Sequence, residues 1–188
     1  EPLITYTAGD LKLATALASQ AAVSIENARL QAERLERERI VKELEIARTI
    51  QESLLPDTMP DIEGAEVTAL SLPAKQVGGD FYDFIPISDD KLGLVIADVS
   101  GKGVPAALFM ALSRALMRAN SLNDPQVANA VLQTNRLILD CTSSGLFVTL
   151  FYAIVDISNH SLRYVCAGHN PPLLYKPRTG DHLWLEAD

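Results

Sequence analysis

Two short motifs place an aspartate beside glycines at the edge of an apolar run. They are residues 78–83 (GGDFYD) and residues 97–103 (ADVSGKG). A carboxylate in such a place is costly unless a cation meets it. Carboxylate oxygens are hard donors, which suit Mg²⁺ or Mn²⁺. Asp80 and Asp98 are therefore the candidate metal ligands and the candidate catalytic residues.

Two aspartates delivered by neighbouring strand ends could share a pair of hard cations. Such a two-metal site can hold a phosphoryl group, activate a bridging water and stabilise an in-line attack, so that no nucleophilic side chain is required. The alternative is that Asp80 and Asp98 serve only as turn and cap residues, which is a common use of aspartate. The local sequence leaves both interpretations open.

The neighbouring polar residues give weaker signals. Asp83 is expected to support the metal ligands rather than to be simply solvated. Ser100 has no clear histidine partner, which argues against a serine nucleophile. Residues 101–103 (GKG) lack the spacing of a nucleotide-binding phosphate loop, although Lys102 could hold a phosphate electrostatically. Gly101 and Gly103 predict a flexible turn before a helix.

His169 lies in residues 167–172 (AGHNPP), after a predicted strand and at the start of a turn stiffened by prolines. It could donate a proton or contact the substrate, whereas a hydrogen bond within its own loop is the simpler interpretation. A lone histidine without ligand spacing does not indicate a zinc site. Phe81 and Tyr82 alternate with the aspartates and are expected in the core.

Residues 11–55 contain no proline or glycine and predict one long helix, which Pro56 and Pro60 end. Its apolar positions form two heptad blocks that are one residue out of step. The shift lies in residues 36–39 (ERER), where Arg37 and Arg39 are candidate regulatory residues. The pattern predicts a dimerising signalling helix with a hinge there; the alternative is a solvated helix packed on its own domain.

The same helix contains opposite charges at i,i+4 spacing, for which Glu33 with Arg37 and Glu38 with Lys42 are the expected pairs.

The period of the apolar residues changes after residue 65. Residues 65–72 and 91–97 predict strands, and Pro105 opens a helix that reaches at least Leu116. Asn123 and Asp124 mark the start of a second helix that ends near Asp140. Two hairpins are then predicted, from residues 147–157 with 162–167 and from residues 173–175 with 183–185. Helices followed by consecutive hairpins imply an α+β fold with an antiparallel sheet.

The composition narrows the classes of function. The chain has 188 residues, of which 48% are hydrophobic, so it is long enough for one domain with a core and an appendage. Its formal charge of −8 argues against nucleic acid as the main partner, and so against a metal-dependent nuclease. No apolar run approaches the length of a membrane span. Cys141 and Cys166 lack CxxC spacing and predict reduced core thiols in a cytoplasmic protein.

A fourth motif, residues 45–56 (EIARTIQESLLP), completes a set with GGDFYD, ADVSGKG and AGHNP. Together these motifs resemble the SpoIIE/RsbU-type bacterial serine/threonine phosphatases, which belong to the metal-dependent PPM family. The resemblance extends from about residue 40 to the end. Residues 21–30 (AAVSIENARL) resemble the last helix of a GAF sensor domain. The resemblances divide the chain into the end of a GAF-like domain (1–35), a helical linker (36–60) and the N-terminal part of a phosphatase domain (61–188).

The resemblance implies a PPM-like antiparallel β-sandwich flanked by helices, incomplete at its C-terminus and preceded by a long coiled-coil-like helix. It implies hydrolysis of phosphoserine or phosphothreonine on a STAS-type anti-anti-sigma protein in a stress or developmental partner-switching pathway. The metals would be Mn²⁺ or Mg²⁺, with Asp80, Asp98 and the carbonyl of Val99 as ligands. Lys102 and His169 are the candidate substrate-binding residues, on the local chemistry of their loops rather than on the resemblance.

The resemblance also implies that regulation acts through the helix that follows Gly103, and that the long N-terminal helix passes a sensor's state to it across a dimer. Further metal-binding aspartates of the family lie downstream, in a DG motif and near the C-terminus. The sequence stops at Asp188 before either, and Asp181 and Asp188 do not sit in such motifs. We therefore expect little phosphatase activity from these residues alone; the alternative is a non-catalytic dimeric module that binds the partner protein.

Overall fold

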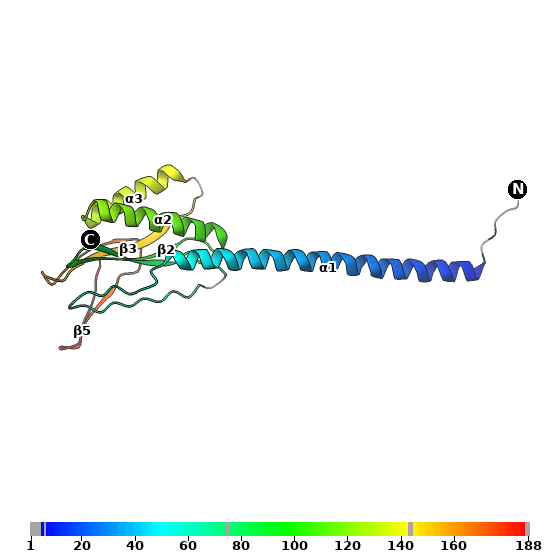
Figure 1. The fold of residues 1–188 in the computed structure, drawn as a ribbon, viewed down its shortest axis with the longest axis horizontal. Helices are drawn as coiled ribbons and strands as arrows, with labels where there is room; N and C mark the ends of the chain where they lie inside the picture. Colours follow the sequence, from blue (N-terminus) through cyan, green and yellow to red (C-terminus); the bar gives the residue numbers. More distant parts are fainter. Residues whose placement is uncertain (1–4, 6, 74–75, 143–144, 187–188) are drawn as a thin grey trace. The chain divides into compact units, whose positions relative to one another are not determined.

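The computed structural model describes residues 5, 7–73, 76–142 and 145–186; Asp188 lies outside them. The chain divides into two compact units, Glu1–Ile46 and Ala47–Asp188. The first helix, α1, spans Ala8–Leu54, so that its last turns belong to the second unit (Figure 1). This confirms the long helix that the absence of proline and glycine predicts.

The start of α1 is capped by Thr7 and Asp10. The Asp10 carboxylate accepts hydrogen bonds from the backbone N–H of Thr7 (2.8 Å) and from its hydroxyl (2.7 Å), and the Thr7 hydroxyl oxygen accepts the backbone N–H of Asp10 (3.2 Å). Such reciprocal capping satisfies N–H groups that have no partner inside the helix. The bonds from Thr7 also lower the pKa of Asp10.

Exposed ion pairs run along α1, but they differ from the predicted ones. Glu33 pairs with Arg29 (3.1 Å) rather than with Arg37, and Glu38 pairs with Arg34 (2.9 Å) rather than with Lys42. Each of these glutamates has a basic residue four positions before it and another four positions after it, and each forms its ion pair with the preceding one. Pairs of this kind contribute only about 0.3–0.5 kcal/mol each. No described residue of α1 is buried, and the helix is continuous through residues 36–39.

The second unit is built on a four-stranded antiparallel sheet in the order β1-β2-β3-β4. Its strands are β1 (Phe81–Ser88), β2 (Lys91–Val99), β3 (Val148–Asp156) and β4 (Ser161–Ala167). Helices α2 (Val104–Asn123) and α3 (Val127–Cys141) pack on each other and on one face of this sheet (Figure 1). A separate hairpin consists of β5 (Leu173–Lys176) and β6 (Asp181–Trp184). The arrangement confirms the α+β class and both predicted hairpins.

The core lies between the sheet and the two helices. Alternate residues of each strand point toward the helices, as the two-residue period of a strand requires. The largest fully buried side chains of this layer are Tyr152, Phe81, Ile85, Met110 and Met117. Tyr82, which was also expected in the core, is only half-buried and lies on the other face of β1.

Residues 65–72 do not form the predicted strand. The described residues here make only an isolated bridge between Ile62 and Ala65, and Leu70 and Leu72 are exposed. The alternation of apolar residues in 65–72 is typical of a half-buried strand. However, the edge of the sheet beside β2 is occupied by β1. Helix α3 also begins at Val127 rather than beside Pro125, because the Asp124 carboxylate accepts the backbone N–H of Gln126 (2.9 Å) in a turn before the helix.

Both cysteines are free thiols, as predicted, but neither is a core residue: Cys141 is exposed and Cys166 is half-buried. Among the described helices, none is long and apolar enough to cross a membrane.

Candidate functional site

The structure brings Asp80 and Asp98 together. Asp80 directly precedes β1 and Asp98 lies next to the end of β2, and the antiparallel register pairs Phe81 with Ala97. Asp80 and Asp98 therefore face each other across the same end of the strand pair. Both line two neighbouring cavities of about 150 and 400 Å³.

The electrostatics of this pair fit a cation. Partial burial of the Asp80 carboxyl raises its pKa, and the hydrogen bond and negative charge of Asp98 raise that pKa further. Two facing carboxylates repel one another when both are ionised, and a bound cation removes that repulsion. Oxygen donors of this kind match Mg²⁺ and Mn²⁺. Among the described residues, no three His, Cys, Asp or Glu side chains cluster closely enough to hold a metal.

Val99 is the residue whose carbonyl was expected to contribute. Its side chain is buried, and Gly79 approaches its backbone closely. A Cβ atom at position 79 would lie 3.0 Å from the carbonyl oxygen of Val99 and 3.1 Å from its Cβ. The second glycine of GGDFYD is therefore required for this close approach, which places Asp80 beside the Asp98–Val99 segment.

Lys102 lines the smaller cavity together with both aspartates and is exposed. The turn that carries it has φ angles of +91° at Gly101 and +81° at Gly103, a conformation that favours glycine. The loop is anchored by Ser100: its N–H donates to the carbonyl of Phe147 (2.8 Å), and its hydroxyl oxygen accepts the N–H of Phe147 (2.9 Å). The Ser100 hydroxyl is thus used for structure, in agreement with the argument against a serine nucleophile.

The end of α1 forms another wall of the smaller cavity. Arg48, Gln51, Glu52 and Leu55 line it. The Gln51 amide makes two hydrogen bonds with the backbone of Gly78: it donates to the carbonyl (2.6 Å) and accepts the N–H (2.9 Å). Gln51 and Arg48 both lie in the EIARTIQESLLP motif, but neither residue type signals such a role in a helix.

His169 lines the larger cavity with Asp80 and Asp98. Its ring Nδ1 is 3.0 Å from the hydroxyl of Thr149, and that hydroxyl is also 3.3 Å from the carbonyl oxygen of Asp98. Thr149 of β3 pairs directly with Asp98 of β2. Thr149 therefore links the imidazole of His169 to the backbone of Asp98, a candidate metal ligand. A threonine within an ordinary strand pattern gives no sequence signal for such a role.

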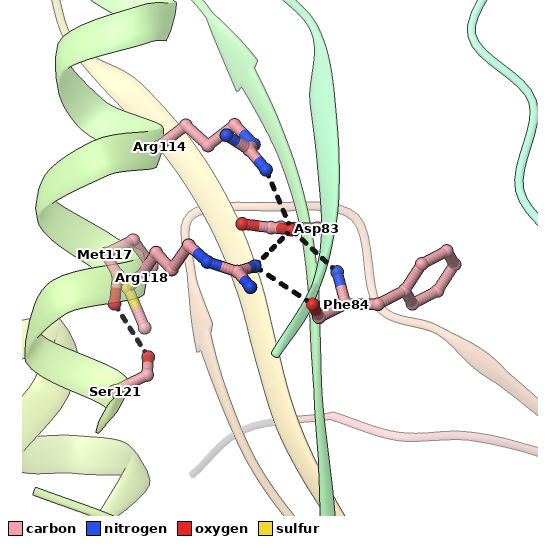
Figure 2. Close-up of polar contacts among 6 residues, drawn as sticks. All are labelled: Asp83, Phe84, Arg114, Met117, Arg118 and Ser121. Carbon is pink, nitrogen blue, oxygen red and sulfur yellow. Dashed lines mark hydrogen bonds and ion pairs between the residues drawn. The ribbon is translucent and has the colours of Figure 1, made fainter. Parts of the chain in front are cut away.

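Asp83 does not support the candidate ligands. Alternation along β1 places it on the helix-facing side, opposite to Asp80. It is 1% exposed and forms ion pairs with Arg114 (3.0 Å) and Arg118 (2.9 Å) of α2, as Figure 2 shows. The carboxylate joins β1 to α2, which corrects the expectation from the sequence.

Comparison with solved structures defines the class of fold. The SiaA-PP2C domain of Pseudomonas aeruginosa matches with a TM-score of 0.58 and 25% identity, over 68% of this chain and 53% of that one. The fold is therefore of the PP2C type, in agreement with the expected PPM-like architecture.

The family follows from the sequence match. The family model described as Stage II sporulation protein E (SpoIIE) matches residues 88–187, which is more than half of the chain, and the chain belongs to this family. Phosphoserine phosphatase RsbU of Bacillus subtilis (strain 168) is 34% identical over 148 residues, covering 79% of this chain and 44% of the relative. Protein IcfG of Synechocystis is 40% identical, covering 69% of this chain and 25% of the relative. The chain spans less than half the length of these relatives.

Proposed function

We propose that the protein is a metal-dependent serine/threonine phosphatase that acts on a phosphorylated STAS-type anti-anti-sigma protein in a partner-switching stress or developmental pathway. The observation that carries the proposal is the convergence of Asp80 and Asp98 in the walls of two cavities. The relation to the phosphoserine phosphatase RsbU supports the reaction class. The protein substrate is carried over from the resemblance of the four motifs.

In this proposal Asp80, Asp98 and the carbonyl of Val99 hold Mn²⁺ or Mg²⁺, two ions in the complete domain. When bound, the metal would lower the pKa of a coordinated water, so that hydroxide would be available at neutral pH to attack phosphorus. The ammonium group of Lys102, in the smaller cavity, attracts the phosphoryl group. The imidazole of His169, in the larger cavity, contacts the substrate.

In this proposal the N-terminal residues 1–60 regulate the phosphatase domain. Residues 1–35 are the end of a GAF-like sensor domain, residues 36–60 are a helical linker and residues 61–188 begin the phosphatase domain. Two copies dimerise through α1, whose large apolar residues are exposed in the single chain. Arg37 and Arg39 lie within the proposed hinge at residues 36–39, and Gly101 and Gly103 let α2 shift. The protein works in the cytoplasm, without nucleic acid as a partner.

The proposal is tested by Mn²⁺-dependent hydrolysis of a phosphorylated STAS-domain protein. This chain is compared with a longer version of the protein that includes the expected downstream aspartates. We expect hydrolysis mainly from the longer version, because the resemblance implies further metal-binding aspartates there. Asp80→Asn abolishes it. Asp89→Asn is the matched control, since Asp89 is an exposed residue in the β1–β2 turn.

A second readout separates metal binding from turnover. Mn²⁺ raises the thermal stability of the chain, and Asp80→Asn removes that increase while Asp89→Asn does not. If the longer version hydrolyses nothing and a pull-down still captures the STAS protein, the proposed activity is wrong. The alternative, a dimeric module that binds this partner without catalysis, then replaces it.

A further inference from the structure

Two arginines of α2 converge on one carboxylate oxygen. Arg114 and Arg118 lie one helical turn apart, and both reach Asp83 on β1 (Figure 2). Nη2 of Arg114 is 3.0 Å and Nη1 of Arg118 is 2.9 Å from the same Oδ1 atom, which also accepts the N–H of Phe84 (2.9 Å). Nη1 of Arg118 donates as well to the carbonyl of Phe84 (3.0 Å).

This arrangement leaves one positive charge unmatched. The two guanidinium groups carry two positive charges and Asp83 carries one negative charge. The side chains of Asp83, Arg114 and Arg118 are 1%, 16% and 37% exposed, so much of the group is removed from water. Nε of Arg114 and Oδ2 of Asp83 are buried with no hydrogen-bond partner among the described residues. The largely buried Arg114 keeps an unpaired N–H donor, and Arg118 is partly open to solvent; a second anion that accepts from these guanidinium groups would offset the excess positive charge.

The arginines open onto a cavity of about 290 Å³. Three prolines form much of its wall: Pro56, Pro60 and Pro86. Asp83 is the only acidic residue among the described lining residues. In the whole chain, by contrast, 24 acidic residues outnumber 16 basic ones. The cavity is thus a local positive site on an acidic protein.

We infer that this cavity binds the side-chain carboxylate of a glutamate presented by another protein. The planar fork of a guanidinium matches a carboxylate with two parallel N–H···O bonds. A carboxylate carries the one negative charge that the site lacks, whereas a phosphate monoester carries about −1.5 to −2. The proline walls add apolar contact for the aliphatic part of a glutamate and for the chain beside it, which a free small anion would not use.

The site is separate from the aspartate pair. Asp83 lies three residues after Asp80, which directly precedes β1, a distance of about 10 Å. Among the described residues, the cavity at Asp83 shares no lining residue with the two cavities at Asp80 and Asp98. The inference therefore does not depend on the phosphatase proposal, and each can fail alone.

The test uses the whole 188-residue chain with ¹⁵N-labelled arginine, titrated with N-acetylglutamate N-methylamide. The Nε–H resonances of Arg114 and Arg118 report binding. We expect saturable shifts with a dissociation constant on the order of 1 mM, and none with the neutral glutamine analogue. Acetate is expected to bind more weakly, because it lacks the apolar contacts. If acetate binds as tightly as the glutamate derivative, the ligand need not be a protein side chain and the inference is wrong. If inorganic phosphate binds as tightly as the glutamate derivative, the site is not selective for a carboxylate and the inference is also wrong.

Variants locate the site. Arg118→Gln should weaken binding by about tenfold, whereas Arg136→Gln, at an exposed arginine of α3, should leave it unchanged. Arg118→Lys keeps the charge but not the fork; it should fold even where the glutamine variant does not, and it should still bind more weakly than the unchanged chain. The inference is wrong if no saturable shift occurs or if the Arg136 variant loses as much affinity as the Arg118 variants.

Discussion

The side-chain amide of Gln51, near the end of α1, pairs with both backbone polar groups of Gly78, two residues before Asp80. These two hydrogen bonds hold a segment that lies outside the described strands. Gly79 in turn contacts the backbone of Val99. A chain of direct contacts thus leads from the last turns of α1 to the candidate metal ligands.

Replacing Gln51 by leucine should loosen this segment. Both hydrogen bonds are lost and the backbone of Gly78 becomes partly unsatisfied, which we expect to lower the free energy of unfolding by about 1–3 kcal/mol. Stabilisation by Mn²⁺ should fall as well, because Asp80 is no longer held in place. Urea denaturation with and without Mn²⁺ measures both effects. Gln133→Leu, at an exposed position of α3, is the control; an equal loss in that variant would refute the argument.

Gly79→Ala tests the close approach to Val99. The added methyl group would meet the carbonyl oxygen at 3.0 Å and the Val99 Cβ at 3.1 Å, both on the buried end of β2. We expect a loss of about 1–3 kcal/mol in the free energy of unfolding. Gly9→Ala in α1 should instead be neutral or slightly stabilising, since its nearest atom would be a side-chain oxygen at 3.5 Å. The melting temperatures of both variants, compared with that of the unchanged chain, test this prediction. An unchanged melting temperature for Gly79→Ala would contradict it.

The sequence predicted the long helix, both hairpins and the pairing of Asp80 with Asp98 at one site. These features depend on local signals: the absence of proline and glycine, the alternation of apolar residues, and aspartates flanked by glycines. The prediction for residues 65–72 was wrong because apolar alternation does not say whether a pairing strand is available. Only the fold shows that β1 occupies that edge.

The residues that surround Asp80 and Asp98 were harder to predict from the sequence. Asp83 lies in the same motif as Asp80, but the strand turns it to the opposite face, toward Arg114 and Arg118, more than thirty positions along the chain. Thr149 reaches the site only because β3 pairs with β2. Contacts of this kind are set by long-range register, which a single sequence does not reveal.

Thr149 is predicted to orient the imidazole of His169. Its hydroxyl has one hydrogen and lies near both the carbonyl of Asp98 and Nδ1 of His169. If the hydroxyl donates to the carbonyl, Nδ1 must carry the hydrogen in the neutral ring. We expect ¹⁵N NMR to show the Nδ1–H tautomer for His169 in the unchanged chain. Thr149→Val should shift the ring toward the Nε2–H tautomer, and Thr149→Ser should restore the original signal.

Loss of the bond should also cost stability, by roughly 1 kcal/mol. A valine variant whose His169 signals match those of the unchanged chain would show that the hydroxyl has no role in orienting the ring. Reduced stability with an unchanged tautomer would point to packing alone.

Asp156 at the end of β3 should make stability depend on pH. Its carboxylate accepts the side-chain N–H (2.9 Å) and backbone N–H (3.0 Å) of Asn159 and lies 3.4 Å from the ammonium of Lys91. The bond from the Asn159 side chain is the largest cause of a pKa below the usual 3.8, and the Asn159 backbone and Lys91 lower it further. An acid whose pKa is lower in the folded state stabilises the fold above its unfolded pKa, and this contribution is lost as the pH falls through the folded pKa.

Asp156→Asn should therefore be less stable than the unchanged chain at pH 7, and the difference should shrink as the pH falls to about 3 and below. Urea denaturation across this range measures it. Asp140→Asn, at an exposed position of α3, should run parallel to the unchanged chain throughout. A gap between the Asp156 variant and the unchanged chain that stays constant down to the lowest pH would show that the carboxylate stabilises the turn by shape and not by charge.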